Sequence, residues 1–360
     1  MRSNQESRGD TVTERDNMDG ELEQIFRLFF DEVPSSFWNI NTSRGDGDFR
    51  ETVIVKTVSG NKYVIKLADN DFTFPDKIKV WQRTVREYID LGYYCPRIYC
   101  DRNGSFPYAE YGGHRCAVYA EEFSPYASIE DRDTDEGEWD TAAYDKYRPD
   151  IWRMTARIAA KYLDYTGYPS GYCLFETFCP SDKTDEVLEE ALKWREYTRT
   201  LPDGFQEQVQ RIWEKWAENR AELEPLYKKL PTSVFQADLN STNVLVDGND
   251  RFVGIYDFNL CGKDVFLNYL MRENGGADFE KERNTICEML RVASGYYHFS
   301  ELEKEAALKL YRCLKPLWNG EERLRKLKGY DEIKALLDKT EHCLTADIDF
   351  RKYMEQKSYR

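Results

Sequence analysis

Three polar residues near the middle of the chain have the types and the spacing that phosphoryl transfer requires. Asp238 and Asn243 stand five positions apart, and Asp257 lies nineteen positions beyond Asp238. An apolar segment precedes each carboxylate, as expected if strands deliver both. One carboxylate of such a set orients an acceptor hydroxyl and takes its proton. An amide oxygen and a second carboxylate hold magnesium on the phosphates of a nucleotide.

Each of these residues also has a simpler interpretation when it is taken alone. Asp238 suits a turn or a helix cap, and Asn243 suits an ordinary loop position before a strand. The functional interpretation therefore depends on whether other parts of the sequence supply the remaining groups.

The composition restricts the classes of partner. The chain has 360 residues, with 51 Lys and Arg against 66 Asp and Glu, a net charge of −15. Such a charge disfavours nucleic acid or an anionic membrane as the main partner, because both would be repelled. We therefore expect neither nucleic acid nor a membrane among the partners.

The cysteines and the N-terminus bear on location. Nine cysteines are scattered without the paired spacing of a disulfide framework or a zinc site, which predicts reduced thiols. The N-terminus has no apolar signal core, and no apolar run is long enough to span a bilayer. We expect a cytoplasmic protein.

The sequence pattern of the first third of the chain predicts a small sheet that carries one helix. Residues 1–17 are polar and predict a disordered leader, and the apolar residues of 22–30 recur at helical spacing. Alternating or β-branched stretches predict strands, and one amphipathic stretch that ends at Gly92 predicts a helix. The expected strands are 37–42, 51–58, 62–67, 97–100 and 116–123, and the helix is 76–91.

The character of the sequence changes after residue 124. An acidic stretch at 129–139 leads into helical patterns at 150–165, 185–199 and 205–229. A β-rich island at 233–258 carries the three polar residues, and helical patterns follow from 264 onward. We predict an α+β chain with a sheet-based nucleotide-binding lobe at 18–124 and a larger helical lobe at 125–360.

The segment QADLNSTNVLVD, followed by VGIYDF, resembles the catalytic region of the aminoglycoside phosphotransferase and choline kinase group of protein-kinase-like small-molecule kinases. The resemblance implies that Asp238 is the catalytic base and that Asn243 and Asp257 bind Mg²⁺. It implies ATP or GTP as donor and a two-lobed kinase-like fold. Gln236 replaces the usual histidine of the loop. In GKD, Asp264 resembles a structural aspartate that opens the next helix.

The small lobe contains further segments that resemble this group. Lys66, in KYVIKL, is similar to the lysine that touches the nucleotide phosphates, and Glu87 is similar to its partner on the helix. AVYAEEF resembles the segment that binds the nucleotide base, which implicates Glu121, Glu122 and Phe123. The turn SRGDGD resembles the phosphate-covering turn without its full glycine pattern. There, phosphate contacts by Ser43, Arg44 and Arg50 remain open against a solvated turn, and Asp46 and Asp48 would repel phosphates.

Three functions remain open. The first is a small-molecule kinase that phosphorylates a hydroxyl of an aminoglycoside, an amino alcohol such as choline, homoserine or a sugar. The second is an inactive nucleotide-binding regulatory module, which the intact Lys66, Asp238, Asn243 and Asp257 disfavour. The third is a protein kinase, which the short passage from Asp257 to the next helix disfavours. The acids of the helical lobe leave a cationic and a neutral acceptor equally open. They lie at Asp131, Asp133, Asp135, Glu136, Glu138, Asp182, Asp185, Glu186, Glu189 and Glu190.

Overall fold

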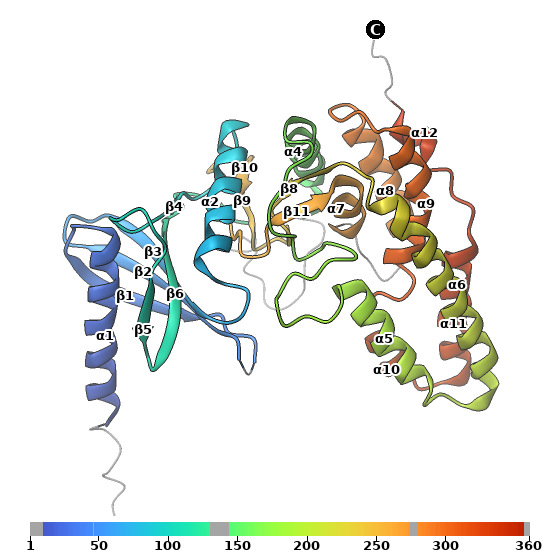
Figure 1. The fold of residues 1–360 in the computed structure, drawn as a ribbon, viewed down its shortest axis with the longest axis horizontal. Helices are drawn as coiled ribbons and strands as arrows, with labels where there is room; N and C mark the ends of the chain where they lie inside the picture. The colour runs from blue at the N-terminus through green and yellow to red at the C-terminus, as the bar shows by residue number, and fades with distance from the viewer. Residues whose placement is uncertain (1–9, 46, 130–143, 274–278, 356–360) are drawn as a thin grey trace, which may run out of the picture. The chain divides into compact units, whose positions relative to one another are not determined.

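The computed structural model describes residues 10–45, 47–129, 144–273 and 279–355, with side chains from residue 19 onward. The chain folds as two compact units (Figure 1). The first unit runs to Ala127 and also includes Leu245–Asn259, and the second consists of Ser128–Val244 and the chain from Leu260. The sequence places the first boundary near residue 124. It does not predict that Leu245–Asn259 belongs to the first unit.

An antiparallel sheet forms the body of the first unit. Its strands follow the order β1-β2-β3-β6-β4, and β5 pairs with β6. The strands expected at 37–42, 51–58, 62–67, 97–100 and 116–123 are confirmed with shifted ends. The bounds are β1 Pro34–Asn41, β2 Phe49–Thr57, β3 Lys62–Asp69, β4 Ile98–Tyr99, β5 Tyr108–Tyr111 and β6 His114–Glu122.

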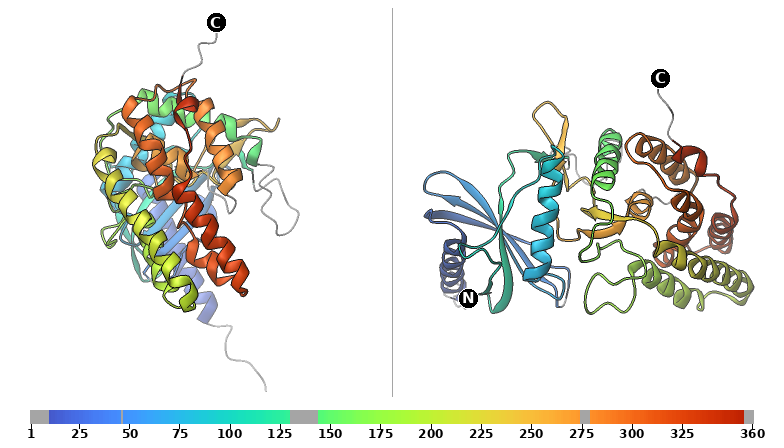
Figure 2. Two further views of the ribbon diagram at one scale, coloured as in Figure 1. Left: turned by 90° about the vertical axis from the view of Figure 1, so that its right-hand side faces the viewer. Right: turned by 45° about the horizontal axis from the view of Figure 1, so that its top comes forward.

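One helix lies on each side of this sheet: α1 (Asp10–Phe29) and α2 (Pro75–Asp90) (Figure 2). Alternate residues of β2 and β3 form a buried core with the apolar residues of α1, which is why these strands alternate in the sequence. The members of this core are Leu22, Ile25, Phe26, Phe29, Val53, Val55, Ile65, Leu67, Tyr111, Cys116, Val118 and Ala120.

Helix α1 begins at Asp10, whereas the sequence predicts a disordered leader to residue 17. The polar residues before Leu22 show no apolar period, so the pattern gave no sign of a helix there. Residues 1–9 of the predicted leader lie outside the described part of the chain.

The second unit is mainly helical. Helix α6 packs against α9 and α11, and the Trp216 indole N–H donates to the Cys313 carbonyl at 2.9 Å. The helices expected at 150–165, 185–199 and 205–229 are confirmed as α4, α5 and α6. The bounds are α4 Arg148–Lys161, α5 Glu186–Thr198, α6 Asp203–Tyr227, α7 Phe266–Glu273, α8 Phe279–Ala293, α9 Glu301–Leu314, α10 Gly320–Arg325, α11 Tyr330–Thr345 and α12 Arg351–Met354.

The β-rich island is confirmed as a set of short strands. Strand β8 pairs with β11, and a separate sheet has the order β10-β9-β7. The bounds are β7 Ala127–Ser128, β8 Thr232–Phe235, β9 Val244–Val246, β10 Phe252–Ile255 and β11 Gly262–Val265. Asp238 follows β8, and Asp257 follows β10. Across the described ranges, every helix is too short or too polar to cross a membrane.

Candidate active site

Lys66 lies on the face of the first unit's sheet that is opposite the α1 core. In the strand register Lys66 pairs with Thr52 and Tyr119, and Thr52 pairs with Ile40. Residues that are paired in register point to the same face of an antiparallel sheet. A second row on this face consists of Trp38, Ile54, Val64 and Glu121.

This face is only partly covered. Tyr119 is buried and packs edge-on against Trp81 of α2, with ring centroids 5.8 Å apart. By contrast, Trp38 is 49% exposed and Ile40 is 47% exposed. The face therefore presents apolar side chains next to the ammonium group of Lys66, a combination that suits a base and its phosphates.

Lys66 forms an ion pair with Asp257, with Nζ 3.9 Å from Oδ1. The two side chains are 19% and 28% exposed, respectively. Burial opposes the charged form of Lys66, but the carboxylates of Asp257 and Glu121 outweigh it and raise the pKa of Lys66. Lys66 is therefore a fixed cation, as a phosphate-binding lysine must be.

The segment that carries Asp257 is fixed against the chain that follows α2. The Tyr94 N–H donates to the Val253 carbonyl at 2.9 Å, and the Ile255 N–H donates to the Tyr94 carbonyl at 3.0 Å. A Cβ atom on Gly254 would lie 1.8 Å from the Tyr94 carbonyl oxygen. Only glycine allows this approach. Asp257 itself has a φ of +59°, a conformation that non-glycine residues adopt only when their surroundings impose it.

The expected ion pair between Lys66 and Glu87 is wrong, because it is not among the ion pairs of the described residues. Glu87 pairs instead with Arg83, Oε1 to Nε 3.4 Å, one turn earlier on α2. The helix directs Trp81 and Tyr88 into the core, and Glu87 is rotated about 100° from Tyr88. The carboxylate of Glu121 acts on Lys66 in its place. Burial raises the pKa of Glu121 to about 7, with Lys66 opposing the shift and Asp257 reinforcing it.

The segment 121–123 combines a buried carboxylate with backbone pairing. Glu121 is buried on the Lys66 face. The Glu122 N–H donates to the Arg97 carbonyl at 2.9 Å, and the ring of Phe123 lies 4.8 Å from Lys62 Nζ. The sequence predicted that this segment belongs to the site, but nothing in the sequence indicated that the Glu121 carboxylate acts on Lys66.

Polar groups of the turn between β1 and β2 bond to one another. The Arg50 N–H donates to Ser43 Oγ at 2.9 Å, and Arg50 Nη2 lies 2.8 Å from Asp48 Oδ2. Arg44 is exposed, and Asp46 lies outside the described residues. These contacts lie within the turn, and the phosphate contacts expected of Ser43, Arg44 and Arg50 stay predictions.

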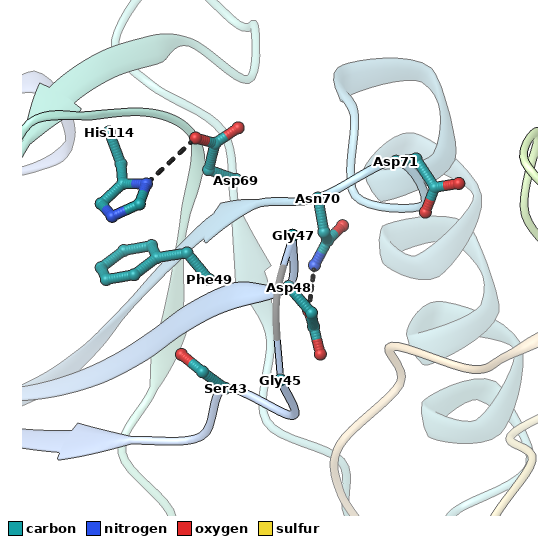
Figure 3. Close-up of a pocket in the computed structure, with 9 residues that line it drawn as sticks. All are labelled: Ser43, Gly45, Gly47, Asp48, Phe49, Asp69, Asn70, Asp71 and His114. Carbon is teal, nitrogen blue, oxygen red and sulfur yellow. Dashed lines mark hydrogen bonds and ion pairs between the residues drawn. The ribbon is translucent and has the colours of Figure 1, made fainter.

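An open cavity of about 650 Å³ lies beside this turn (Figure 3). In it the ring of Phe49 stacks on His114 at 4.0 Å, and His114 Nδ1 lies 3.2 Å from Asp69 Oδ2. Phe49 and Asp69 are in register on the sheet face opposite Lys66. The aspartates that line the cavity would repel phosphates. The full lining is Ser43, Gly45, Gly47, Asp48, Phe49, Asp69, Asn70, Asp71 and His114.

In the second unit, Asp238 stands at the head of a tightly bonded loop. Its φ is +76°, and its backbone carbonyl accepts from Asn243 Nδ2 at 2.8 Å. Asn240 Nδ2 donates to Asp238 Oδ1 at 2.9 Å, and the Thr242 N–H donates to Asn240 Oδ1 at 2.9 Å. The loop thus brings Asp238 and Asn243 together and fixes the Asp238 carboxylate, as required of a catalytic base.

The backbone on either side of Asp238 is held by Glu273, the last residue of α7. Glu273 Oε1 accepts from the N–H groups of Asp238 and Leu239, each at 3.0 Å. The Tyr144 hydroxyl donates to the Leu239 carbonyl. Burial raises the pKa of Glu273 to about 7; the nearby Asp238 charge adds to the shift, and hydrogen bonds from Leu239, Asp238 and Tyr172 oppose it. No motif in the sequence pointed to Glu273.

Two further residues of the predicted motif, Gln236 and Asp264, are buried and form hydrogen bonds within the second unit. Gln236, in place of the histidine, is fully buried, and its backbone carbonyl accepts from the Tyr269 hydroxyl at 2.7 Å. Asp264 is buried and accepts hydrogen bonds from Tyr227 at 2.9 Å and Ser170 at 3.1 Å. Burial raises the pKa of Asp264 to about 6. These bonds agree with the structural role expected for Asp264.

The described acids among those considered for an acceptor have local partners. Asp185 caps α5 through the Leu188 N–H and pairs with Arg220. Glu189 and Glu190 both pair with Lys193. Asp182 accepts from the Cys179 N–H, and Glu186 pairs with Arg272. The acids of the expected linker (Asp131, Asp133, Asp135, Glu136 and Glu138) lie outside the described residues.

The residues expected to hold a metal have suitable donor atoms. Carboxylate and amide oxygens, as in Asp257 and Asn243, suit a hard divalent cation. In the ranges that the structure covers, no group of three or more His, Cys, Asp or Glu side chains could hold a metal. Magnesium in kinases needs no such cage, because nucleotide phosphates and water supply its other ligands.

The chain belongs to the phosphotransferase enzyme family, whose model matches residues 44–267, or 224 of 360 residues. The match includes Lys66, Asp238, Asn243 and Asp257. The predicted relationship to kinase-like phosphotransferases is therefore confirmed at the level of the family. No curated protein sequence matches the chain significantly.

Solved structures resemble the chain in fold. One is the microcompartment-associated aminopropanol kinase, with 12% identity, a TM-score of 0.54, and coverage of 90% of this chain and 94% of that one. Another is an amicoumacin kinase in complex with AMP-PNP and Ca²⁺, with 13% identity, a TM-score of 0.50, and coverage of 96% and 99%. These similarities confirm the α+β kinase-like fold that the sequence predicts.

Proposed function

We propose that the protein transfers the terminal phosphoryl group of ATP or GTP to a hydroxyl group of a small molecule. The observation that carries this proposal is the ion pair between Lys66 and Asp257 on a half-covered apolar face. A lysine beside a carboxylate at this position suits nucleotide phosphates and their cation. The AMP-PNP and Ca²⁺ in the amicoumacin kinase structure support a nucleotide and a divalent cation as cofactors here too.

We assign a separate role in the reaction to each residue of the candidate site. Lys66 binds the phosphates, and the backbone of segment 121–123 binds the base. Asn243 and Asp257 would hold Mg²⁺, and the ion would neutralise phosphate charge. Asp238 orients the acceptor hydroxyl and accepts its proton as the new O–P bond forms. A cytoplasmic location, expected from the scattered spacing of the nine cysteines, is part of this proposal.

The side chains around Asp238 bear on the acceptor. The guanidinium of Arg272 lies 4.9 Å from the ring centroid of Tyr172 and 4.2 Å from that of Trp318. It therefore occupies ring faces that a quaternary ammonium group would use. Glu186 and Glu273 supply two carboxylates against this one cation. The balance favours an amine-bearing or neutral acceptor over choline.

The test is nucleotide turnover by the purified protein. ATP or GTP with Mg²⁺ is incubated with 1-amino-2-propanol, choline, homoserine, glucose or kanamycin, and nucleoside diphosphate release is measured. We expect release that depends on one class of acceptor. Tight nucleotide binding without turnover of any acceptor would favour the inactive regulatory module instead.

Salt dependence distinguishes the charge of the acceptor. Screening by salt weakens attraction between a cationic acceptor and nearby carboxylates, and so lowers kcat/KM. A neutral acceptor of similar size should keep its kcat/KM. Selective turnover of anionic acceptors would contradict the proposed preference.

A further inference from the structure

Glu273 contacts the backbone of the catalytic loop at two successive residues. Its Oε1 atom accepts the N–H of Asp238 and the N–H of Leu239, each at 3.0 Å. These N–H groups belong to the two peptide planes that flank the Asp238 Cα atom. Successive N–H groups that converge on one anion form a nest, which fixes both planes at once.

Asp238 needs such support because its backbone is strained. A φ of +76° in a non-glycine residue is unfavourable and persists only where neighbours impose it. The carbonyl of the second of these peptides, that of Asp238, accepts from Asn243, and the carbonyl of the following peptide, that of Leu239, accepts from Tyr144. These two bonds come from neutral donors. Glu273 differs from them because one of its oxygens accepts both N–H groups and so holds together the two peptides that flank the Asp238 Cα atom.

Glu273 is itself fixed. It ends helix α7, whose side chains from Phe266 to Met271 are buried, and the Tyr172 hydroxyl hydrogen-bonds to its carboxylate. A carboxylate held from two sides can in turn hold a strained loop in one conformation.

We infer that Glu273 is a positioning residue that locks Asp238 in the left-handed conformation from which its carboxylate acts as the base. The inference rests on the proposed function, because it takes Asp238 as the base. Glu273 acts through the two backbone N–H groups and does not touch the substrate.

The first test measures the loop without any substrate. Hydrogen exchange of peptides that span residues 236–243 is compared in the wild type, Glu273→Leu and Glu273→Gln. Leucine preserves volume but accepts no hydrogen bond, whereas glutamine retains an acceptor oxygen. We expect the amides of Asp238 and Leu239 to exchange at least about tenfold faster in Glu273→Leu and to regain most protection in Glu273→Gln. Unchanged exchange in Glu273→Leu would overturn the inference.

The second test measures turnover of Mg·ATP with the fastest acceptor among 1-amino-2-propanol, choline, homoserine, glucose and kanamycin. We expect Glu273→Leu to lower kcat by about thirtyfold or more at an unchanged KM for ATP, and Glu273→Gln to restore most of the loss. Equal losses in the two variants would overturn the inference. If Glu273→Leu does not fold, Glu273→Asp, which withdraws the oxygen by one methylene, should lower kcat in the same way.

A double-mutant cycle separates this inference from the proposed function. If Glu273 acts through Asp238, Asp238→Asn and the double variant Asp238→Asn/Glu273→Leu should have nearly equal kcat values. Additive losses would show that Glu273 acts elsewhere. Full activity of Asp238→Asn would instead refute Asp238 as the base, while the exchange measurement would still decide whether Glu273 holds the loop.

Discussion

The Nζ atom of Lys66 lies 3.9 Å from the Oδ1 atom of Asp257, although 191 positions separate the two residues in the sequence. Both belong to the same compact unit, because residues 245–259 join the sheet-based unit. Glu121 adds a second carboxylate that acts on Lys66. The pair is therefore built within one unit, and nucleotide binding can be tested separately from acceptor chemistry.

The first prediction concerns Lys66. Lys66→Ala should weaken ATP binding by about tenfold or more, since a phosphate-binding cation is lost. Isothermal titration with Mg·ATP measures the change. Lys56→Ala, an exposed lysine on the neighbouring strand β2, is the matched control and should bind normally. Equal affinities of the two variants would contradict the assignment.

The second prediction separates Glu121 from Glu87. Glu121→Gln removes a buried charge that acts on Lys66, and we expect a three- to tenfold loss of ATP affinity, on the order of 1 kcal/mol. Glu87 pairs with Arg83, which is 59% exposed, so Glu87→Gln should change affinity by less than about twofold. The reverse ranking would restore Glu87 as the partner of Lys66.

The third prediction tests the apolar part of the nucleotide face. Trp38→Ala should lower ATP affinity by about tenfold, because base–aromatic contacts contribute about 1–3 kcal/mol. Trp38 is 49% exposed, so the unfolding midpoint should hardly change. Leu192→Ala, a similarly exposed residue of α5, serves as the control. Unchanged affinity in Trp38→Ala would place the base elsewhere.

The extent to which the sequence predicted the site can be followed residue by residue. The spacing of Asp238, Asn243 and Asp257 depends on short-range loop geometry, so it is visible in the sequence. The strands of the first unit were also visible, since one face is buried against α1 and leaves an alternating pattern.

Other contacts left no local signal. Glu121 and Glu87 are both acidic residues on regular elements, and only the register with Lys66 and the rotation of α2 distinguish them. Glu273 lies 35 positions after Asp238 and accepts hydrogen bonds from backbone N–H groups. Because these groups do not depend on the residue type, the residues at positions 238 and 239 do not indicate the contact. Tertiary contacts of this kind cannot be deduced from periodicity.

The fourth prediction concerns stability and pH. Glu32 accepts hydrogen bonds from Ser59, Tyr63, Asn61 and Thr57, which lower its pKa from 4.5 to about 2. A lowered pKa means that the stabilisation is complete above about pH 4.5 and is lost as the pH falls toward 2.

Glu32→Gln should therefore lower the free energy of unfolding by about 1–2 kcal/mol at pH 7. The difference from the wild type should shrink by roughly half between pH 5 and pH 3. Urea denaturation at each pH, followed by a probe in the first unit, measures this. A difference that grows as the pH falls would contradict the sign of the shift.

The central claim is that Asp238 is the base that accepts the proton of the acceptor hydroxyl. The most direct measurement compares kcat and the dissociation constant of Mg·ATP for Asp238→Asn and the wild type, with the acceptor that turns over fastest. Asparagine is nearly isosteric but cannot accept the proton, so kcat should fall by about a hundredfold or more while ATP affinity stays within about twofold. A kcat near that of the wild type would contradict the account.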